Sequence, residues 1–364
     1  MSAPGETIEA ISQRLDMFVT GQRASVQDAG AEATLFFDAA ARAASGGKRL
    51  RGRFCVAGWS AVEGGSSGRD VLPESVVTAA AALELFQAAA LVHDDVIDNS
   101  DTRRGRPAAH RALESVHGDA RWVGDAAAFG RSAAILLGDL LVAWSDDLFE
   151  EGLADLSPAR AVAARSEYST MRRDVTLGQF LDIAEESAFL SEPDHRHADR
   201  ALRVASFKSA RYSVQQPLAI GAALAGADQE QAAALAAFGH PLGMAFQLRD
   251  DVLGVFGDEA ETGKPAGDDL REGKRTVLIA YTREALAPTA RRIVDELVGD
   301  PSLDAGQIAS LQQTIADTGA LERVERLIAD FVREADRALS GARLDNAAVS
   351  RLRDLARAAT VRTA

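Results

Sequence analysis

Apolar positions recur at helical spacing along almost the whole chain, and this pattern predicts a protein built from helices. The expected helices cover residues 6–21 and 26–45, a third that opens at "GGKRLRGRF", then 76–98, 126–150, 158–186, 194–224, 230–256 and 277–298, with about three more within 305–359. No internal repeat, linker or change of composition divides the chain. We therefore expect one all-α domain, residues 1–364, folded as a bundle of about ten or more helices.

The longest apolar stretch, "VVTAAAALELFQAAALV", is interrupted by Glu84 and Gln87 and runs directly into aspartates. This pattern favours a buried core helix over a transmembrane segment. The N-terminal residues contain neither a basic segment nor an apolar run typical of a signal peptide. A single cysteine, Cys55, excludes an internal disulfide. We expect a cytoplasmic protein with no transmembrane segment.

Charge changes this picture mainly by excluding one class of partner. The chain carries a formal net charge of -14, whereas nucleic-acid-binding proteins normally carry a basic surplus. We therefore expect no nucleic-acid partner. Anionic small molecules remain compatible with this charge, because they need only a local basic pocket.

The long apolar helix ends in an acidic cluster, "HDDVIDNSDTRRGRP", whose charges work against the helix. Asp94 and Asp98 lie four residues apart, on one helix face and about 6 Å from each other. They also stand at the C-terminal end, where the helix dipole disfavours negative charge. A divalent cation resolves both conflicts, and Mg²⁺ held by carboxylates and substrate phosphates fits best. Arg103 and Arg104 follow at once and suit diphosphate oxygens, although a solvated acidic helix end is an alternative.

A second apolar helix repeats the arrangement in "FQLRDDVLGVFGD". Asp250 and Asp251 end the run, with Gln247 one turn earlier. Gly254 stands where a third aspartate would complete the D-D-x-x-D pattern. If the ends of both helices meet at one rim, the two acidic clusters face each other across an apolar cavity. Such a cavity suits a substrate with a hydrocarbon tail and a diphosphate head.

Basic residues occur at a few places in this acidic chain that could bind an anion. "GGKRLRGR" contains Lys48 and Arg51 just before a predicted helix, where backbone N–H groups can also face an anion. Isolated lysines occur at Lys208 in "FKSARY", and at Lys264 and Lys274 in a polar, glycine-rich loop of about 20 residues. These side chains are candidates to bind phosphate, although solvated loop charges are the simpler interpretation of each one alone.

Taken in order, these motifs resemble those of the trans-isoprenyl diphosphate synthases, the polyprenyl synthetase family. The order is G-G-K-R-L-R, Q-x(6)-D-D-x-x-D with R-R-G, F-K-S, F-Q-x-x-D-D and G-K, within a motif core of about 40–275. The resemblance is greatest to bacterial geranylgeranyl diphosphate synthases. It implies an all-α fold of the isoprenoid synthase type I class around a deep central cavity, and a homodimer. It also implies Mg²⁺-dependent, head-to-tail condensation of an allylic diphosphate with isopentenyl diphosphate.

The resemblance also implies roles for individual residues. Mg²⁺, as more than one ion, is expected at Asp94, Asp95, Asp98, Asp250 and Asp251. Isopentenyl diphosphate is expected at Lys48, Arg51, Gln87 and Arg104, and the allylic diphosphate at Arg103, Lys208 and Lys264, with Lys274 as a further contact. Ser209 and Gln247 are expected near the developing allylic cation. The expected catalytic group is Lys208, Ser209, Gln247 and Arg103.

Product length is expected to depend on the helix that carries the first cluster. Ala89 and Ala90 precede Asp94 where short-chain relatives place a bulky aromatic side chain. Phe86 lies about 12 Å from Asp94 along the helix and is a candidate partial floor. We expect a C20 product, geranylgeranyl diphosphate, and C15 or C25 and longer products remain alternatives. Phe86 could equally be a packing residue of the core.

Two other functions are compatible with parts of the pattern. A class I terpene cyclase shares D-D-x-x-D, but its N-D-x-x-S-x-x-x-E type motif is absent from the sequence. A catalytically inactive regulatory subunit of a synthase is the second alternative, because Gly254 leaves the second motif incomplete.

Overall fold

The chain is almost entirely helical, as the apolar pattern predicts. The computed structural model describes residues 4–64, 72–257 and 266–360. Its helices are α1 (Pro4–Ala24), α2 (Ala31–Ala44), α3 (Leu50–Glu63), α4 (Glu74–Ile97), α5 (Ala109–Asp119), α6 (Ala126–Leu153), α7 (Pro158–Ala188), α8 (His197–Val204), the π-helix η5 (Ala205–Gln215), α9 (Gln216–Ala225), α10 (Gln229–Phe256), α12 (Asp268–Glu272), α13 (Val277–Ala285), α14 (Pro288–Leu297), α15 (Ala305–Asp317), α16 (Ala320–Ala338) and α17 (Asn346–Thr360). Short 3-10 turns lie at Gln27–Ala29, Phe189–Ser191 and Asp194–Arg196. The all-α prediction is confirmed.

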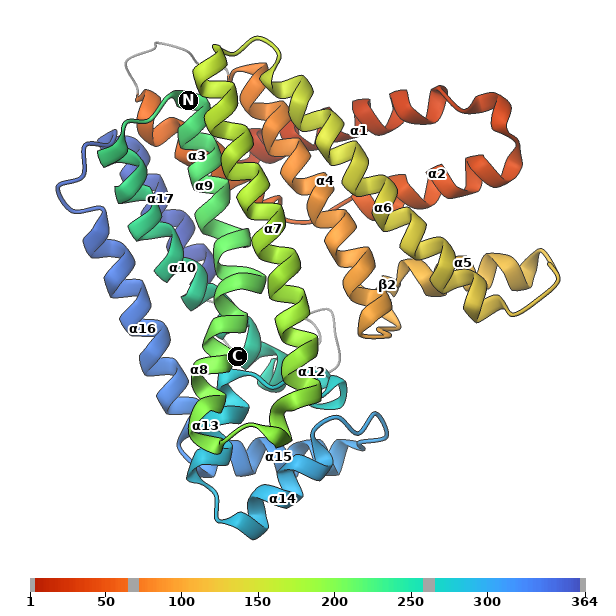
Figure 1. Cartoon of the computed structure of the whole chain (residues 1–364), viewed down its shortest axis with the longest axis vertical. Coiled ribbons are helices and arrows are strands. Elements are labelled where there is room, and N and C mark those ends of the chain that lie inside the picture. The colour runs from red at the N-terminus through yellow and green to blue at the C-terminus, as the bar shows by residue number, and fades with distance from the viewer. Residues whose placement is uncertain (1–3, 65–71, 258–265, 361–364) are drawn as a thin grey trace.

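The long helices run alongside one another through the body of the molecule (Figure 1). Helices α4, α6, α7 and α9 run lengthwise or obliquely through the body, α13 to α15 gather at one end, and α1 and α2 project from one side. In the described part of the chain, β-structure is limited to the hairpin of Thr102–Arg103 (β1) and Arg106–Pro107 (β2).

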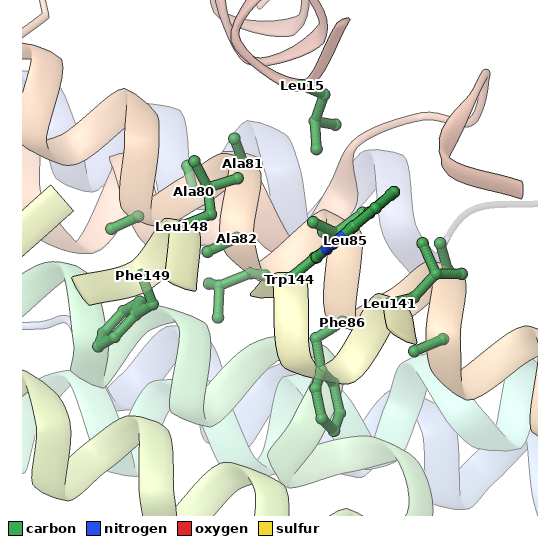
Figure 2. Packing of buried hydrophobic residues seen from close by; sticks show 14 of the residues in the cluster. Leu15, Ala80, Ala81, Ala82, Leu85, Phe86, Leu141, Trp144, Leu148 and Phe149 are labelled. Carbon is green, nitrogen blue, oxygen red and sulfur yellow. The ribbon is translucent and has the colours of Figure 1, made fainter. Parts of the chain in front are cut away.

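The main hydrophobic core forms where α4 packs on α6 (Figure 2). The alanines at positions 79–82 of α4 are fully buried and let the backbone of α6 approach closely. Large side chains of α6, such as Trp144 and Phe149, fill the remaining space together with Leu15 of α1. This packing explains why "VVTAAAALELFQAAALV" forms a core helix, and it fixes the direction in which the first aspartate cluster points.

Glycines allow two further helices to pass at backbone distance. A Cβ on Gly58 of α3 would lie 2.2 Å from the carbonyl oxygen of Leu218 in α9. A Cβ on Gly221 of α9 would lie 1.9 Å from the carbonyl oxygen of Cys55 in α3. Neither position has room for a side chain. The α3–α9 pair therefore forms a rigid wall behind the basic segment at the start of α3.

The expected single helix over 194–224 is wrong in detail, because it divides into α8, the π-helix η5 and α9. π-Helices are rare and concentrate at functional sites. Two neighbouring glycines hold this one tightly: a Cβ on Gly178 of α7 would lie 2.2 Å from the backbone nitrogen of Lys208, and one on Gly243 of α10 would lie 2.3 Å from the carbonyl oxygen of Ala210. Lys208 is therefore positioned by backbone packing on two sides.

Three other expectations about elements need correction. The helix expected over 277–298 breaks between α13 and α14, where Pro288 starts a new helix because its ring has no N–H to donate. Part of the expected polar loop forms the short helix α12. The apolar pattern also missed α5, a short helix of eleven residues between the hairpin and α6.

Two helices, α4 and α6, are long and apolar enough to cross a membrane by length and composition. In α4, 72% of the apolar window is buried inside the protein, as in a core helix of a soluble protein. In α6, 28% of the residues of the apolar window are buried, and Ile135 and Leu136 are exposed.

Candidate active site

A cavity of about 650 Å³ brings together residues from α3, α4, the hairpin, α7, η5, α10 and α12. The predicted residues that line it are Lys48, Arg51, Gln87, Ala90, Asp94, Arg103, Arg104, Lys208, Ser209, Gln247, Asp250, Asp251 and Lys274. Residues as far apart in sequence as Lys48 and Lys274 therefore meet at one site, as the motif pattern predicts.

Several predicted residues lie elsewhere. Asp95, Asp98, Phe86 and Ala89 do not line the cavity. Lys264 lies outside the residues that the structure describes. Phe86 is buried and makes edge-on contacts with the rings of Tyr168 and Tyr212. Of this aromatic group, Tyr212 is the member that borders the cavity.

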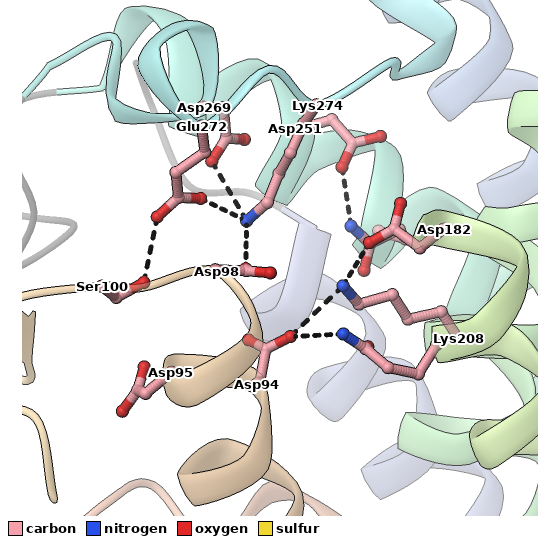
Figure 3. Close-up of polar contacts among 12 residues, drawn as sticks. Asp94, Asp95, Asp98, Ser100, Asp182, Lys208, Asp251, Asp269, Glu272 and Lys274 are labelled. Atoms are coloured by element: carbon pink, nitrogen blue, oxygen red, sulfur yellow. Dashed lines mark hydrogen bonds and ion pairs between the residues drawn. The ribbon is translucent and has the colours of Figure 1, made fainter. Parts of the chain in front are cut away.

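Asp94 is the part of the first cluster that faces the cavity (Figure 3). Its Oδ1 lies 3.4 Å from the Nζ of Lys208 and accepts a hydrogen bond of 3.1 Å from the Nε2 of Gln179. Burial raises the pKa of Asp94, but Lys208, Lys274 and Arg103 lower it more strongly, to about 2. Asp94 is therefore an ionised carboxylate that neighbouring cations stabilise.

Asp98 is the C-terminal cap of α4 and contacts a cation from a different segment. Its Oδ2 is buried, accepts no hydrogen bond from the described residues, and lies 3.5 Å from the Nζ of Lys274. Burial and the nearby Asp94 raise the pKa of Asp98 to about 6. The same lysine pairs with Glu272 at 2.6 Å, and Ser100 donates a hydrogen bond to that glutamate (Figure 3).

Asp95 points away from the cavity and binds Arg103 instead (Figure 3). The Nε of Arg103 donates to its Oδ1 at 2.8 Å, and a second guanidinium nitrogen donates to the same oxygen. The hairpin turn that carries Arg103 contains Arg104 and Gly105, both with positive φ. Two successive positive φ values are those of a tight two-residue hairpin turn. Asp95 thus orients Arg103, and its predicted contact with Mg²⁺ stays a prediction.

The two basic segments predicted from the sequence lie against each other. Arg104 donates a hydrogen bond of 3.0 Å to the carbonyl oxygen of Ser45, and its guanidinium fills the space beside Gly47. A Cβ on Gly47 would lie 2.9 Å from this guanidinium. The guanidinium thus packs directly against the Gly47 backbone, and "GGKRLR" and "RRGR" form one basic wall.

Arg51 belongs to the same wall and is tied to η5. It donates a hydrogen bond of 2.7 Å to Ser213 and stacks over the ring of Tyr212, 4.2 Å from its centroid. The hydroxyl of Tyr212 donates in turn to the Oε1 of Gln87 at 2.7 Å. By contrast, Arg49 is buried and bonds Ser12 and the carbonyl of Ala44, so it is a structural residue.

The second cluster lies across the cavity on α10. Gln247 donates a hydrogen bond of 2.6 Å from its Nε2 to Asp251, and Asp250 also lines the cavity. Burial and the nearby Asp269 raise the pKa of Asp251 to about 8. A carboxyl group with this raised pKa gains from a nearby cation, because positive charge favours its ionised form.

The carboxylate groups of the two aspartate clusters fit Mg²⁺ as a ligand set. All are carboxylate oxygens, and the buried Oδ2 of Asp98 has no hydrogen-bond donor among the described residues. In the same part of the chain, no three His, Cys, Asp or Glu side chains converge to hold a metal ion by themselves. The arrangement therefore suits a cation held by one or two carboxylates and completed by substrate phosphates, which is how Mg²⁺ is commonly bound.

Sequence reasoning missed two polar residues of α7. Gln179 and Asp182 line the cavity, and Asp182 pairs with the Nζ of Lys208 at 2.5 Å. The signal was a Q-x-x-D pair on one helix face, but a polar pair at this spacing is common on solvated helices. Asp269 and Arg275 also line the cavity and were not predicted.

Comparison with known proteins decides the family. The sequence model for "Polyprenyl synthetase" matches residues 34–315. The chain belongs to the polyprenyl synthetase family. The family predicted from the motifs is thereby confirmed, and with it the enzyme class, a prenyltransferase, and the isoprenoid synthase fold.

Individual members of the polyprenyl synthetase family are similar over long stretches. A structure of geranylgeranyl pyrophosphate synthase from Corynebacterium glutamicum, complexed with isoprenyl diphosphate and magnesium, has a TM-score of 0.92 and 38% identity over 100% of both chains. A geranylgeranyl diphosphate synthase of Mycobacterium tuberculosis is 33% identical over 82% of this chain and 79% of that protein. A short chain isoprenyl diphosphate synthase of Methanocaldococcus jannaschii is 29% identical over 65% of this chain and 64% of that protein.

Proposed function

We propose that this prenyltransferase is a Mg²⁺-dependent synthase that condenses an allylic diphosphate of C5 to C15 with isopentenyl diphosphate, head to tail, to give a trans-polyprenyl diphosphate. One observation carries the proposal: aspartates from α4 and α10 line a single cavity together with the basic wall of Lys48, Arg51, Arg103 and Arg104. Separate acidic and basic surfaces in one cavity suit two diphosphates and the metal ions between them.

Asp94, Asp98 and Asp250 are the proposed Mg²⁺-binding residues, with Asp95 and Asp251 beside them. When bound, Mg²⁺ neutralises the diphosphate that leaves the allylic substrate. Lys208 adds a positive charge at the same place, since Asp94 and Asp182 hold its ammonium group.

The remaining cations divide between the two substrates. Lys48, Arg51, Arg104 and Gln87 bind isopentenyl diphosphate, and the contacts of Arg51 and Gln87 with Tyr212 support this grouping. Arg103, Lys208, Lys264 and Lys274 bind the allylic diphosphate. Positive charge is most effective in this role when it is preorganised, and Asp95 holds Arg103 in place.

The proposed reaction breaks the allylic C–O bond, and its electron pair leaves with the diphosphate. The double bond of isopentenyl diphosphate then attacks the allylic carbon, and loss of a proton to the released diphosphate restores a double bond. Ser209 and Gln247 are proposed near the positive charge that develops. The Nε2 of Gln247 is engaged by Asp251, which supports an amide oxygen directed toward that charge.

Geranylgeranyl diphosphate is the proposed product. The small side chain of Ala90 lines the cavity beside Leu91, so the α4 wall carries no aromatic residue near Asp94. Phe86 lies behind Tyr212, which supports a floor made by this aromatic pair. A cavity open beyond Tyr212 would give C25 or longer products, and a floor above it would give C15.

A homodimer is the proposed assembly, in the cytoplasm. Support comes from α6, where Ile135 and Leu136 are 47% and 61% exposed. Three large apolar residues of α7 are also exposed: Leu177, Phe180 and Ile183. Cys55 is buried, which suits a reducing compartment. That residues 1–364 form a single domain stays a prediction.

The test is turnover by the purified chain without any partner protein. We expect product from isopentenyl diphosphate and an allylic primer, loss of all activity with EDTA, and recovery when excess Mg²⁺ is added. Activity that survives complete metal removal would contradict the proposal. Absence of product from the chain alone, with recovery on adding a partner synthase, would instead favour an inactive regulatory subunit.

A further inference from the structure

Gly254 is the residue at which α10 departs from a complete D-D-x-x-D motif. It lies four residues after Asp250, on the same helix face, and lines the cavity. A third aspartate at this place would direct its carboxylate toward the cavity. The chain therefore either lacks a third acidic group or obtains it from another element.

The space beside Gly254 is filled by a carboxylate from α12. A Cβ built on Gly254 would lie 1.9 Å from the Oδ2 of Asp269 and 2.4 Å from its Cγ. No side chain can occupy position 254 unless the Asp269 carboxyl group moves. Asp269 also lines the cavity, so this carboxylate stands at the cavity wall where a side chain from residue 254 would begin.

Helix α12 is anchored tightly, so this carboxylate has a defined position. Leu270 is buried, and its carbonyl oxygen accepts a hydrogen bond of 2.8 Å from the backbone nitrogen of Gly299. Gly267 and Gly273 flank the helix with positive φ. A Cβ on Gly267 would lie 2.6 Å from Ile308, and one on Gly273 would lie 3.0 Å from Gly299. The backbone of α12 thus has little room to shift.

Asp269 also connects the two acidic clusters. Its Oδ1 lies 3.7 Å from the Nζ of Lys274, and this ammonium group is 3.5 Å from Asp98 of the first cluster (Figure 3). The carboxylate therefore stands between the α10 cluster and the α4 cluster, which is where the metal and diphosphate of the proposed reaction would lie.

We propose that Asp269 replaces the missing third aspartate of the second motif, so that the acidic group facing the Mg²⁺–diphosphate comes from α12 as well as α10. This inference rests on the proposed function of the cavity. The incomplete motif is then no sign of an inactive subunit, because the carboxylate is retained at a different position of the chain.

In the alternative, the only role of Asp269 is to form the ion pair with Lys274. The two roles differ in what a carboxylate at position 254 can do. An aspartate there could restore a group that faces Mg²⁺, but it would come from a different helix and would not reproduce the ion pair with Lys274.

Four proteins distinguish the two roles: wild type, Asp269→Ala, Gly254→Asp, and the double variant Gly254→Asp with Asp269→Ala. The readout is Mg²⁺ binding in the presence of inorganic diphosphate by calorimetry, followed by turnover. We expect Asp269→Ala to weaken Mg²⁺ binding by about 10-fold or more. Gly254→Asp alone should also weaken it, because two carboxylates compete for one space. The double variant should bind Mg²⁺ more tightly than either single variant.

Wild-type Mg²⁺ affinity in Asp269→Ala would overturn the inference, as would a double variant no better than Asp269→Ala. If Asp269→Ala proves unstable, Asp269→Asn takes its place, because it keeps the shape of the side chain. The same loss of Mg²⁺ affinity is expected for it. The proposed function is judged separately by wild-type product formation, since binding of Mg²⁺ and diphosphate is measured without any prenyl substrate.

Discussion

At the scale of single residues, the cavity is organised by opposite charges from different helices. Lys208 of η5 contacts Asp94 of α4 and Asp182 of α7, and Lys274 contacts Asp98. Each ammonium group offsets carboxylates that would otherwise repel one another. Burial strengthens these interactions, since charges in a low-dielectric cavity are screened less than charges in water.

Replacing Asp94 with alanine tests whether this carboxylate binds metal. We expect Asp94→Ala to lower turnover by at least about 100-fold, because a preorganised charge at the reacting diphosphate is lost. The fold should be retained, since α4 is held by its buried alanine face. Steady-state rates and circular dichroism would measure the two effects.

Asp101→Ala is the matched control, because this aspartate lies nearby but its side chain is 80% exposed and pairs with Arg111. It should keep wild-type turnover. Wild-type turnover in Asp94→Ala itself would refute the role given to Asp94.

The first cluster was visible in the sequence because it violates ordinary helix electrostatics. Asp94 and Asp98 repel each other at a helix C-terminus, so the cluster stood out even though a solvated acidic helix end remained an alternative. Gln179 and Asp182 violate no rule, so sequence reasoning could not separate them from a solvated helix face. The sequence also could not predict that Asp269 lines the cavity, because the position of α12 depends on its contacts with Gly299 and Ile308.

At the scale of elements, the π-helix η5 shows how close packing shapes the site. Apolar periodicity predicted one continuous helix over 194–224. It could not predict the local change from α-helix to π-helix within that stretch. The cause lies in other segments, because Gly178 and Gly243 allow the backbones of α7 and α10 to contact η5 at Lys208 and Ala210. Tertiary contacts of this kind override local pattern.

Adding one methyl group at Gly178 should displace η5. The new Cβ would meet the backbone at Lys208, which cannot rotate away as a side chain can. We expect Gly178→Ala to destabilise the protein by about 1–3 kcal/mol and to lower turnover more than that loss of folded protein explains. Thermal unfolding and rates at a temperature well below the transition would measure both effects.

Gly21→Ala in α1 is the control, since nothing lies within 4 Å of its added Cβ. This change should be neutral or slightly stabilising, because alanine favours helix more than glycine does. If Gly178→Ala were equally neutral, the packing argument for η5 would be wrong.

At the scale of the whole molecule, the exposed apolar side chains of α6 are a candidate dimer surface. The sequence showed that α6 is apolar, but only the fold shows that its Ile135 and Leu136 are exposed while Leu137 and Leu141 are buried. Pattern alone cannot distinguish a helix buried in its own core from one that a second subunit covers. The dimer followed from the family resemblance, and the structure adds a candidate surface.

Light scattering coupled to gel filtration tests this surface. We expect the wild type to have twice the mass of the 38.4 kDa chain. Leu136→Asp should shift it toward a monomer, because the charge would be buried without a partner. Met17→Asp, on an α1 residue that is 70% exposed, should leave the mass unchanged. A monomeric wild type would contradict the proposal that α6 forms a dimer surface.

The most direct test of the account is the length of the product. The purified chain would be incubated with Mg²⁺, labelled isopentenyl diphosphate and each of the C5, C10 and C15 allylic primers, and the products would be dephosphorylated and sized. We predict that a C20 alcohol dominates with every primer, because Ala90 adds no bulk to the cavity wall beside Asp94 and Tyr212, backed by Phe86, is the proposed floor. Failure of all three primers to give any product would contradict the central claim that this cavity condenses prenyl diphosphates.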